Sequence, residues 1–342
     1  MKRLLHLLMV ALVLAPLSLS AKERFRVAWS HYTGWEPWGY AAQAGILKKW
    51  ADKYDIDVEL TLVNDYVESI NLYTAGKFDA CAMTNMDALT IPAVGGIDSE
   101  AVIIGDFSNG NDGIVMKRGA GVADLKGRTI NLVELSVSHY LLARALDMNG
   151  LSERDVKLVN TSDADIAALF ISDENGAAVT WNPPLMQARN AEGAKLVFDS
   201  SKIPGEIIDM MVVRSDAPAS LKQALVGAWY ETLGVMTGKD EQAAKAIEYM
   251  ANASGATVAE FKAQLATTAM FYTPADAVAF TSSQKPAETM EHVRRFSFDK
   301  GLYGEAADSP DFVGIRFDDG KVLGDAGNIK LRFTSKWMKG QP

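Results

Sequence analysis

Short apolar runs alternate with longer stretches of helical periodicity along the first two thirds of the chain. The runs are rich in β-branched residues, so each is typical of a buried strand. Strands are predicted at residues 24–29, 58–63, 80–83, 102–105, 114–116, 129–132, 156–159, 177–180 and 196–198. Such alternation favours an α/β fold in which mainly parallel sheets are covered by helices.

Helix starts are marked by capping residues and prolines. Pro37 suits the first turn of a helix that continues toward Tyr54, and residues 218–301 have an almost wholly helical pattern. Further starts are indicated by Ser136, by Asp163, by the capping box of Thr257 and Glu260, and by Thr273-Pro274.

Two similar segments divide the chain. Residues 111–116 and 208–213 each place an aspartate at or beside the start of an apolar run, and they enclose an α/β block of about 95 residues. The length also exceeds what one core usually organises. We therefore expect a lobe 1 of residues 22–112 plus 214–302, a lobe 2 of residues 113–213, and a cleft between them. Two extended strands would form the hinge.

The amino terminus has the pattern of a secretory signal peptide over residues 1–21. Lys2 and Arg3 precede an apolar run, residues 4–17, and small residues follow it. The run is shorter than the roughly 20 residues that span a bilayer, which disfavours a retained anchor. Cys81 is the only cysteine, so neither a lipid at the new amino terminus nor an internal disulfide is expected. The pattern predicts a periplasmic protein with no direct membrane anchor.

Composition excludes several function classes. The formal charge of −9 becomes −11 once the signal is removed, and no basic cluster is present, so nucleic acid is a poor partner. The four histidines lack metal-ligand spacing, and no phosphate loop or nucleophile elbow is found. We therefore expect that the protein is not an enzyme and that it binds no cofactor and no metal.

An aromatic loop, residues 29–38, follows the first predicted strand. Ligands of open α/β sheets bind at the carboxyl edge of the strands, where this loop is expected. Tyr32 and Trp35 are the candidates for binding, whereas Trp38 fits helix packing better. His31 is open to either role.

Several acids and amides are predicted to lie at the same edge. Asp65, Asn85 and Asp87 follow the next two strands, although helix capping explains the two aspartates equally well. Trp181 and Asn182 end a strand of lobe 2, opposite these loops. Asp209 sits at a crossover and either faces the cleft or satisfies hinge backbone; Asp112 is the weaker candidate of that kind.

An ordered set of motifs carries a family resemblance. It comprises LKGRTI at 125–130, SVSHYLL at 136–142, DVKLVN at 155–160, AVTWNPP at 178–184 and FDSSKIPGE at 198–206. Together they resemble periplasmic solute-binding proteins of ABC importers, in the branch for sulfonates, taurine, nitrate and the thiamine pyrimidine. The resemblance implies the two-lobed periplasmic binding protein type II fold, a monomer, and ABC permease transmembrane subunits as partners.

Residues 29–38 and 133–136 are most similar to the subgroup associated with urea carboxylase operons, which implies urea or guanidinium as cargo. Anion-binding relatives have a small-residue loop before the first helix of lobe 2, where this chain has Glu134 ahead of Ser136. Glu134 would repel an anion and accept from a planar cation, or else it only caps the helix. The other readings are an aminopyrimidine, a sulfonate or taurine as cargo, and, more distantly, a pyrimidine-synthesising enzyme.

The tail from Tyr303 contains an Asp319-Gly320 hairpin signal and is predicted to pack on lobe 1 as an extension of residues 303–342.

Overall fold

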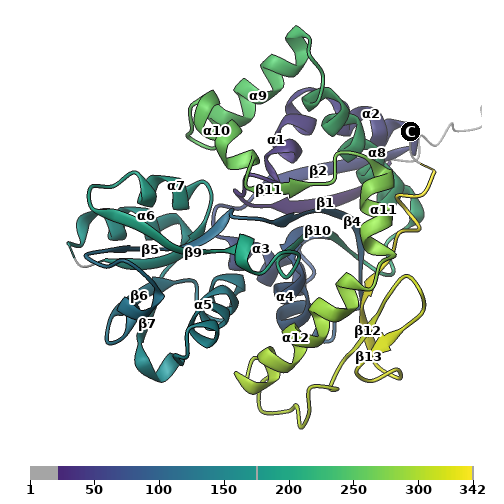
Figure 1. The fold of residues 1–342 in the computed structure, drawn as a ribbon. Coiled ribbons are helices and arrows are strands. Elements are labelled where there is room, and N and C mark those ends of the chain that lie inside the picture. Colours follow the sequence, from purple (N-terminus) through teal and green to yellow (C-terminus); the bar gives the residue numbers. More distant parts are fainter. Residues whose placement is uncertain (1–21, 175, 341–342) are drawn as a thin grey trace, which may run out of the picture.

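The computed structural model describes residues 22–174 and 176–340, and the predicted signal segment, residues 1–21, lies outside them. Within the described residues the chain forms two sheets flanked by helices (Figure 1), which confirms the predicted α/β class. We call each sheet with its helices a lobe. Among the described residues, no helix combines the length and apolar character needed to cross a membrane.

The larger lobe contains a sheet of nine strands in the order β13-β12-β14-β4-β10-β3-β1-β2, with β11 paired to β4, counted over the described residues. Its strands are β1 (Glu23–Trp29), β2 (Ile56–Leu62), β3 (Ala80–Thr84), β4 (Ser99–Ser108), β10 (Ile208–Arg214), β11 (Thr268–Met270), β12 (Gly314–Arg316), β13 (Val322–Leu323) and β14 (Ile329–Phe333). Its helices are α1 (Glu36–Gln43), α2 (Ile46–Lys53), α3 (Tyr66–Thr74), α4 (Asn85–Ala88), α8 (Ala219–Met236), α9 (Glu241–Ala253), α10 (Val258–Leu265), α11 (Pro274–Thr281) and α12 (Lys285–Asp299), and a π-helical turn spans Leu89–Ala93.

The smaller lobe has five strands in the order β7-β6-β8-β5-β9, again within the described residues. They are β5 (Asp112–Lys117), β6 (Thr129–Leu132), β7 (Lys157–Asn160), β8 (Ala177–Trp181) and β9 (Ala194–Asp199). The helices are α5 (Val137–Met148), α6 (Asp163–Ser172) and α7 (Pro184–Arg189), with short 3-10 turns at Val122–Leu125, Glu153–Asp155 and Ser200–Lys202.

Both sheets are mixed, whereas mainly parallel sheets were expected. β10 is antiparallel to β3 and β4, and β5 is antiparallel to β8 and β9. The reason is the double crossing between lobes. β4 runs toward the smaller lobe and β10 returns from it, so these neighbours point in opposite directions, and β5 and β9 do the same in the other sheet.

The return crossing lies earlier in the chain than the expected boundary. Residues 208–213 were assigned to lobe 2, but they form β10, which is buried between β3 and β4 in the larger sheet. The chain therefore crosses at residues 109–111 and 200–207. Ser108, at the end of β4, and Ser200, in the return crossing, share a hydrogen bond between their hydroxyls at 2.7 Å.

The predicted helix from Pro37 toward Tyr54 is divided in two. Gly45 has φ +74°, a left-handed conformation that ends α1 and starts α2 at a new angle. The other marked helix starts agree with the structure within a residue: Ser136 and Thr257 are N-caps, and Ser162 rather than Asp163 precedes α6.

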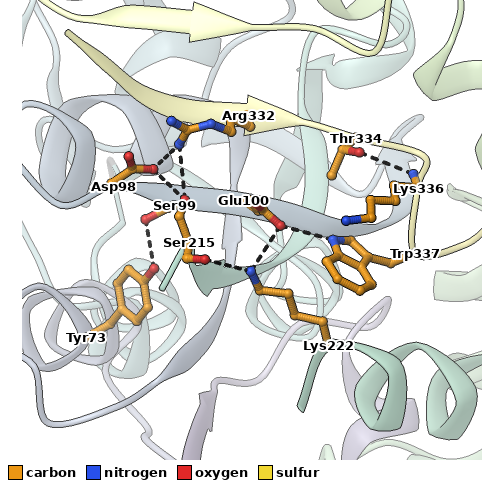
Figure 2. A network of polar contacts seen from close by, with 10 residues as sticks. All are labelled: Tyr73, Asp98, Ser99, Glu100, Ser215, Lys222, Arg332, Thr334, Lys336 and Trp337. Carbon is orange, nitrogen blue, oxygen red and sulfur yellow. Dashed lines mark hydrogen bonds and ion pairs between the residues drawn. The ribbon is translucent and has the colours of Figure 1, made fainter. Parts of the chain in front are cut away.

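The carboxyl-terminal segment extends the larger sheet. β12 and β13 pair antiparallel around Asp319-Gly320, and β14 adds parallel to β4. Figure 2 shows how polar contacts fasten this segment: Arg332 pairs with Asp98, and Trp337 Nε1 donates to Glu100 Oε2 at 3.0 Å. The segment is thus part of the lobe's hydrogen-bonded core.

Lys222 is central to that network. It is 3% exposed, lies 3.2 Å from Glu100 and donates to the Ser215 carbonyl at 2.9 Å. We expect Lys222→Met to lower the free energy of unfolding by about 2 kcal/mol, because Glu100 would stay largely buried without its cation. Thermal or urea denaturation measures this. Lys245→Met, at an exposed pair within α9, is the control and should change stability by less than about 0.5 kcal/mol.

Candidate functional site

A small cavity lies between the two lobes, at the carboxyl ends of β1, β3 and β8. About 240 Å³ of it is free of protein atoms, part of this space being open to solvent, and the centre of a water molecule can move within only about 10 Å³, so the space is narrow. The lining combines four aromatic rings with carboxyls and apolar groups: Tyr32, Trp35, Tyr66, Thr84, Asp112, Val137, Trp181, Ile207 and Asp209. No lysine, arginine or histidine is among these lining residues.

The aromatic rings form a continuous wall. The centroids of Tyr32 and Trp35 are 5.0 Å apart, those of Trp35 and Tyr66 5.6 Å, and those of Tyr66 and Trp181 5.4 Å. Trp181 belongs to the smaller lobe, and its Nε1 donates to the His31 carbonyl of the larger lobe at 3.2 Å. The wall therefore spans both lobes and closes the cavity on one side.

Four buried aspartates surround the cavity. Asp112 and Asp209 line it, Asp106 lies opposite Asp209 across β4 and β10, and Asp87 is bonded to the lining residue Tyr66. Tyr66 donates to Asp87 Oδ2 at 2.6 Å, and Tyr32 donates to Asp106 Oδ1 at 2.8 Å. Within the described part of the chain, Asp87 Oδ1 and Asp112 Oδ2 have no hydrogen-bond partner, whereas the carboxyls of Asp106 and Asp209 form a hydrogen bond with each other, which requires a proton on one of them.

Burial raises the pKa of all four carboxyls, because the charged form loses its hydration. The pKa of Asp87 rises to about 6, and those of Asp106 and Asp112 to about 7. The pKa of Asp209 rises well above its ordinary value, through burial first and then through the charges of Asp106 and Asp112. The site thus concentrates carboxyl groups without a compensating cation, and burial keeps part of them protonated near neutral pH in the ligand-free protein.

These carboxyls should make the ligand-free protein less stable as the pH rises. Each folded-state pKa exceeds its unfolded value, so the native state holds extra protons, and the stability they contribute at low pH is lost as the pH passes through about 6 to 7. We expect the free energy of unfolding to fall by about 2 kcal/mol or more between pH 5 and pH 8. The raised pKa of His31, caused mainly by its hydrogen bond to Glu36, acts in the same direction.

Urea denaturation across that range tests the expectation. Asp112→Asn removes one of the buried carboxyls, so its stability should fall less steeply with pH than that of the wild type, while His31 contributes equally to both. Parallel curves for the two proteins would show that Asp112 does not titrate in this window.

The structure brings four of the ten predicted binding residues to the cavity wall: Tyr32, Trp35, Trp181 and Asp209. Asp87 adjoins the wall through Tyr66. The other five are outside the lining: Asp65 caps α3, Asn85 binds the backbone at Glu206 and Ile208, Ser136 caps α5, Asn182 bonds to Asn111 by its N–H, and Glu134 is half-exposed.

Sequence reasoning ranked Asp112 low and did not select Tyr66, Thr84, Val137, Ile207 or Asp106. For Asp106 a signal was present, because a carboxylate in the middle of the apolar run of β4 needs a reason to be buried. The others are ordinary residues at strand or helix ends, and only the folded chain places them at the cavity.

Comparisons with known proteins agree with this fold. A family model described as NMT1/THI5 like matches residues 40–227, more than half of the chain. No curated protein sequence gives a match.

Solved structures of similar fold include two sulfonate-binding proteins and one nitrate-binding protein. The periplasmic aliphatic sulphonate binding protein SsuA of Escherichia coli is 17% identical with a TM-score of 0.67, covering 84% of this chain and 95% of its own. The alkanesulfonate-binding protein SsuA of Xanthomonas axonopodis pv. citri, bound to MOPS, is 18% identical with a TM-score of 0.65, covering 84% and 96%. The periplasmic nitrate-binding protein NrtA of Synechocystis PCC 6803 is 12% identical with a TM-score of 0.59, covering 89% and 96%. At these sequence identities, the comparison shows that this chain shares the periplasmic binding protein fold, and it shows nothing about the ligand.

Proposed function

The chain belongs to the NMT1/THI5-like family, and on that premise we propose that it is the periplasmic substrate-binding component of an ABC importer whose cargo is guanidinium. The observation that carries the choice of cargo is the group of four buried aspartates around a cavity with no basic lining residue. One of them, Asp112, lines the cavity with an oxygen that lacks a donor.

A cation satisfies what this site lacks. Burying an uncompensated carboxylate costs several kcal/mol, and that cost is offset when a positive ligand donates hydrogen bonds to it. Guanidinium is planar and carries N–H donors around its whole edge, so Asp112 and Asp209 can accept from it in one plane. Its faces would lie against the rings of Trp35, Tyr66 and Trp181, where cation–π attraction contributes about 0.5 to 2 kcal/mol.

The same features disfavour the other cargoes. Nitrate and alkyl sulfonates are anions, and taurine carries a sulfonate beside its ammonium group. Ionised aspartates would repel these negative groups, and the cavity offers no cation to hold them. An aminopyrimidine has about twice as many heavy atoms as guanidinium, so the narrow space would have to widen further to admit it. The proteins of similar fold that bind sulfonate or nitrate therefore share the architecture with this chain, while the lining argues for a different ligand.

Urea is the second candidate, and one observation favours it. Asp106 and Asp112, with a pKa of about 7, are partly protonated at neutral pH, and a protonated carboxyl can donate to the urea carbonyl. Urea and guanidinium have the same shape, so the charge of the site decides between them.

Two lobes joined by two crossings support a mechanism of capture by closure. We propose that the lobes rotate about residues 109–111 and 200–207, that cargo binds between them, and that the closed form is delivered to the transmembrane subunits of a permease. The Trp181 bond to the His31 carbonyl would then form on closure.

Titration calorimetry of unfolded, ligand-stripped and refolded protein tests the cargo. Guanidinium, urea, taurine, nitrate and hydroxymethylpyrimidine would each be titrated at pH 8. We expect guanidinium to bind at least a hundredfold more tightly than any other. Tight taurine or nitrate binding without guanidinium binding would refute the proposal of a cation-binding site. Tight binding of urea alone would identify urea as the cargo.

A further inference from the structure

Outside the cavity, helix α5 of the smaller lobe faces helix α12 of the larger lobe (Figure 1). Phe296 of α12 packs edge-on against Tyr140 of α5, with centroids 5.1 Å apart and planes at 86°. The same ring is 6.2 Å from His139. This contact between the lobes involves none of the residues that line the cavity.

At one end of this contact, a charged pair links the lobes. Lys300, which follows α12, places Nζ 2.7 Å from Glu153 Oε1, and His139 Nε2 is 3.1 Å from the same oxygen. Burial alone would raise the pKa of Glu153, but Lys300 and His139 lower it to about 2. Glu153 is therefore ionised at neutral pH and attracts Lys300 across the lobe boundary.

At the other end, Glu206 accepts three hydrogen bonds from two residues of α5. Arg144 Nε and Nη2 lie 2.9 and 3.1 Å from its two oxygens, and the Tyr140 hydroxyl donates at 2.6 Å. Glu206 belongs to the return crossing, and Asn85 Nδ2 of the larger lobe donates to its carbonyl at 3.1 Å. The first end therefore joins the two lobes directly, and the second joins the smaller lobe to the crossing where it meets the larger lobe.

An open groove runs beside these contacts, lined by residues of α5, α12 and the turn at Glu153. The contact between α5 and α12 thus combines a few directional polar pairs with the Phe296 ring. Contacts of this kind suit a reversible closure.

We propose that Lys300, Glu153, Arg144 and Glu206, here called the α5–α12 clasp, are positioning residues that set the balance between open and closed lobes. The inference rests on the proposed function, because affinity depends on this balance only if cargo binds the closed form. The apparent dissociation constant rises as the closed fraction falls, so loss of the clasp weakens binding without altering the cavity.

A charge-reversal cycle tests the clasp. In Lys300→Glu, two carboxylates oppose each other, so we expect a larger radius of gyration of the ligand-free protein in small-angle X-ray scattering. We also expect about tenfold weaker guanidinium binding, mainly through faster dissociation. Adding Glu153→Lys reverses the pair and should restore both quantities. Lys262→Glu, the same charge change on an exposed residue of α10, should leave both unchanged.

Unchanged scattering and affinity in Lys300→Glu would overturn the proposal, and so would a double variant that stays as open as the single one. Lys300→Met removes the pair without repulsion and gives the same test at smaller amplitude if Lys300→Glu does not fold. Scattering of the ligand-free proteins needs no cargo, so it decides about the clasp even if guanidinium fails to bind the wild type.

Discussion

Replacing Asp112 by asparagine is expected to weaken guanidinium binding at least a hundredfold at pH 8, equivalent to about 3 kcal/mol. Asp112 lines the cavity, has a free Oδ2 and has no basic residue among its lining neighbours. Asparagine keeps the shape, but it removes the charge and replaces an acceptor with a donor that would face the N–H groups of the ligand. The same variant should be more stable than the wild type when ligand-free at pH 8, because one buried charge is gone.

Calorimetry measures the affinity, and urea denaturation measures the stability. Glu134→Gln is the matched control, because its carboxyl lies outside the cavity lining and its removal should change affinity less than threefold. If Asp112→Asn bound guanidinium as tightly as the wild type, Asp112 would have no part in recognition. If Glu134→Gln lost as much guanidinium affinity as Asp112→Asn, the ligand would bind at the loop before α5.

Guanidinium affinity is also expected to fall at least a hundredfold between pH 8 and pH 5. The ligand-free carboxyls have raised pKa values, about 6 for Asp87 and about 7 for Asp106 and Asp112. Below these values they hold protons that a bound cation must displace, since the cation favours the ionised form. Binding should therefore release protons, and acid should oppose it.

Calorimetry in buffers of different ionisation enthalpy counts the protons released, and we expect about one to two per guanidinium at pH 6.5. Urea is the matched ligand of equal shape without charge, and its affinity should stay constant or rise toward pH 5. A guanidinium affinity that does not change with pH would mean that the four aspartates are already ionised, or lie apart from the ligand.

Local signals in the sequence were enough for the elements of this fold. Alternation of apolar runs with capped helical segments located the strands and most helix starts, because hydrogen bonding within a segment and burial of one face are short-range requirements. Local signals could not predict the sheet to which β10 belongs or the direction in which it pairs. Its apolar run looks the same on either side of the lobe boundary, and only packing between β3 and β4 assigns it to the larger sheet.

The site divides in the same way. By itself the sequence determined that acids and aromatic rings, without lysine or arginine, gather in loops at the carboxyl edge of the strands. Four of the residues selected from the sequence line the cavity: Tyr32, Trp35, Trp181 and Asp209. Which of the other acids joins them was decided by the tertiary structure alone. Asp65 follows a strand and Asp106 lies within one. The half-buried Asp65 caps α3 and accepts from Ser162 Oγ, whereas Asp106 is buried opposite Asp209. That difference arises from long-range pairing of β4 with β10, since burial of a charge depends on every segment that surrounds it and not on its neighbours in the chain.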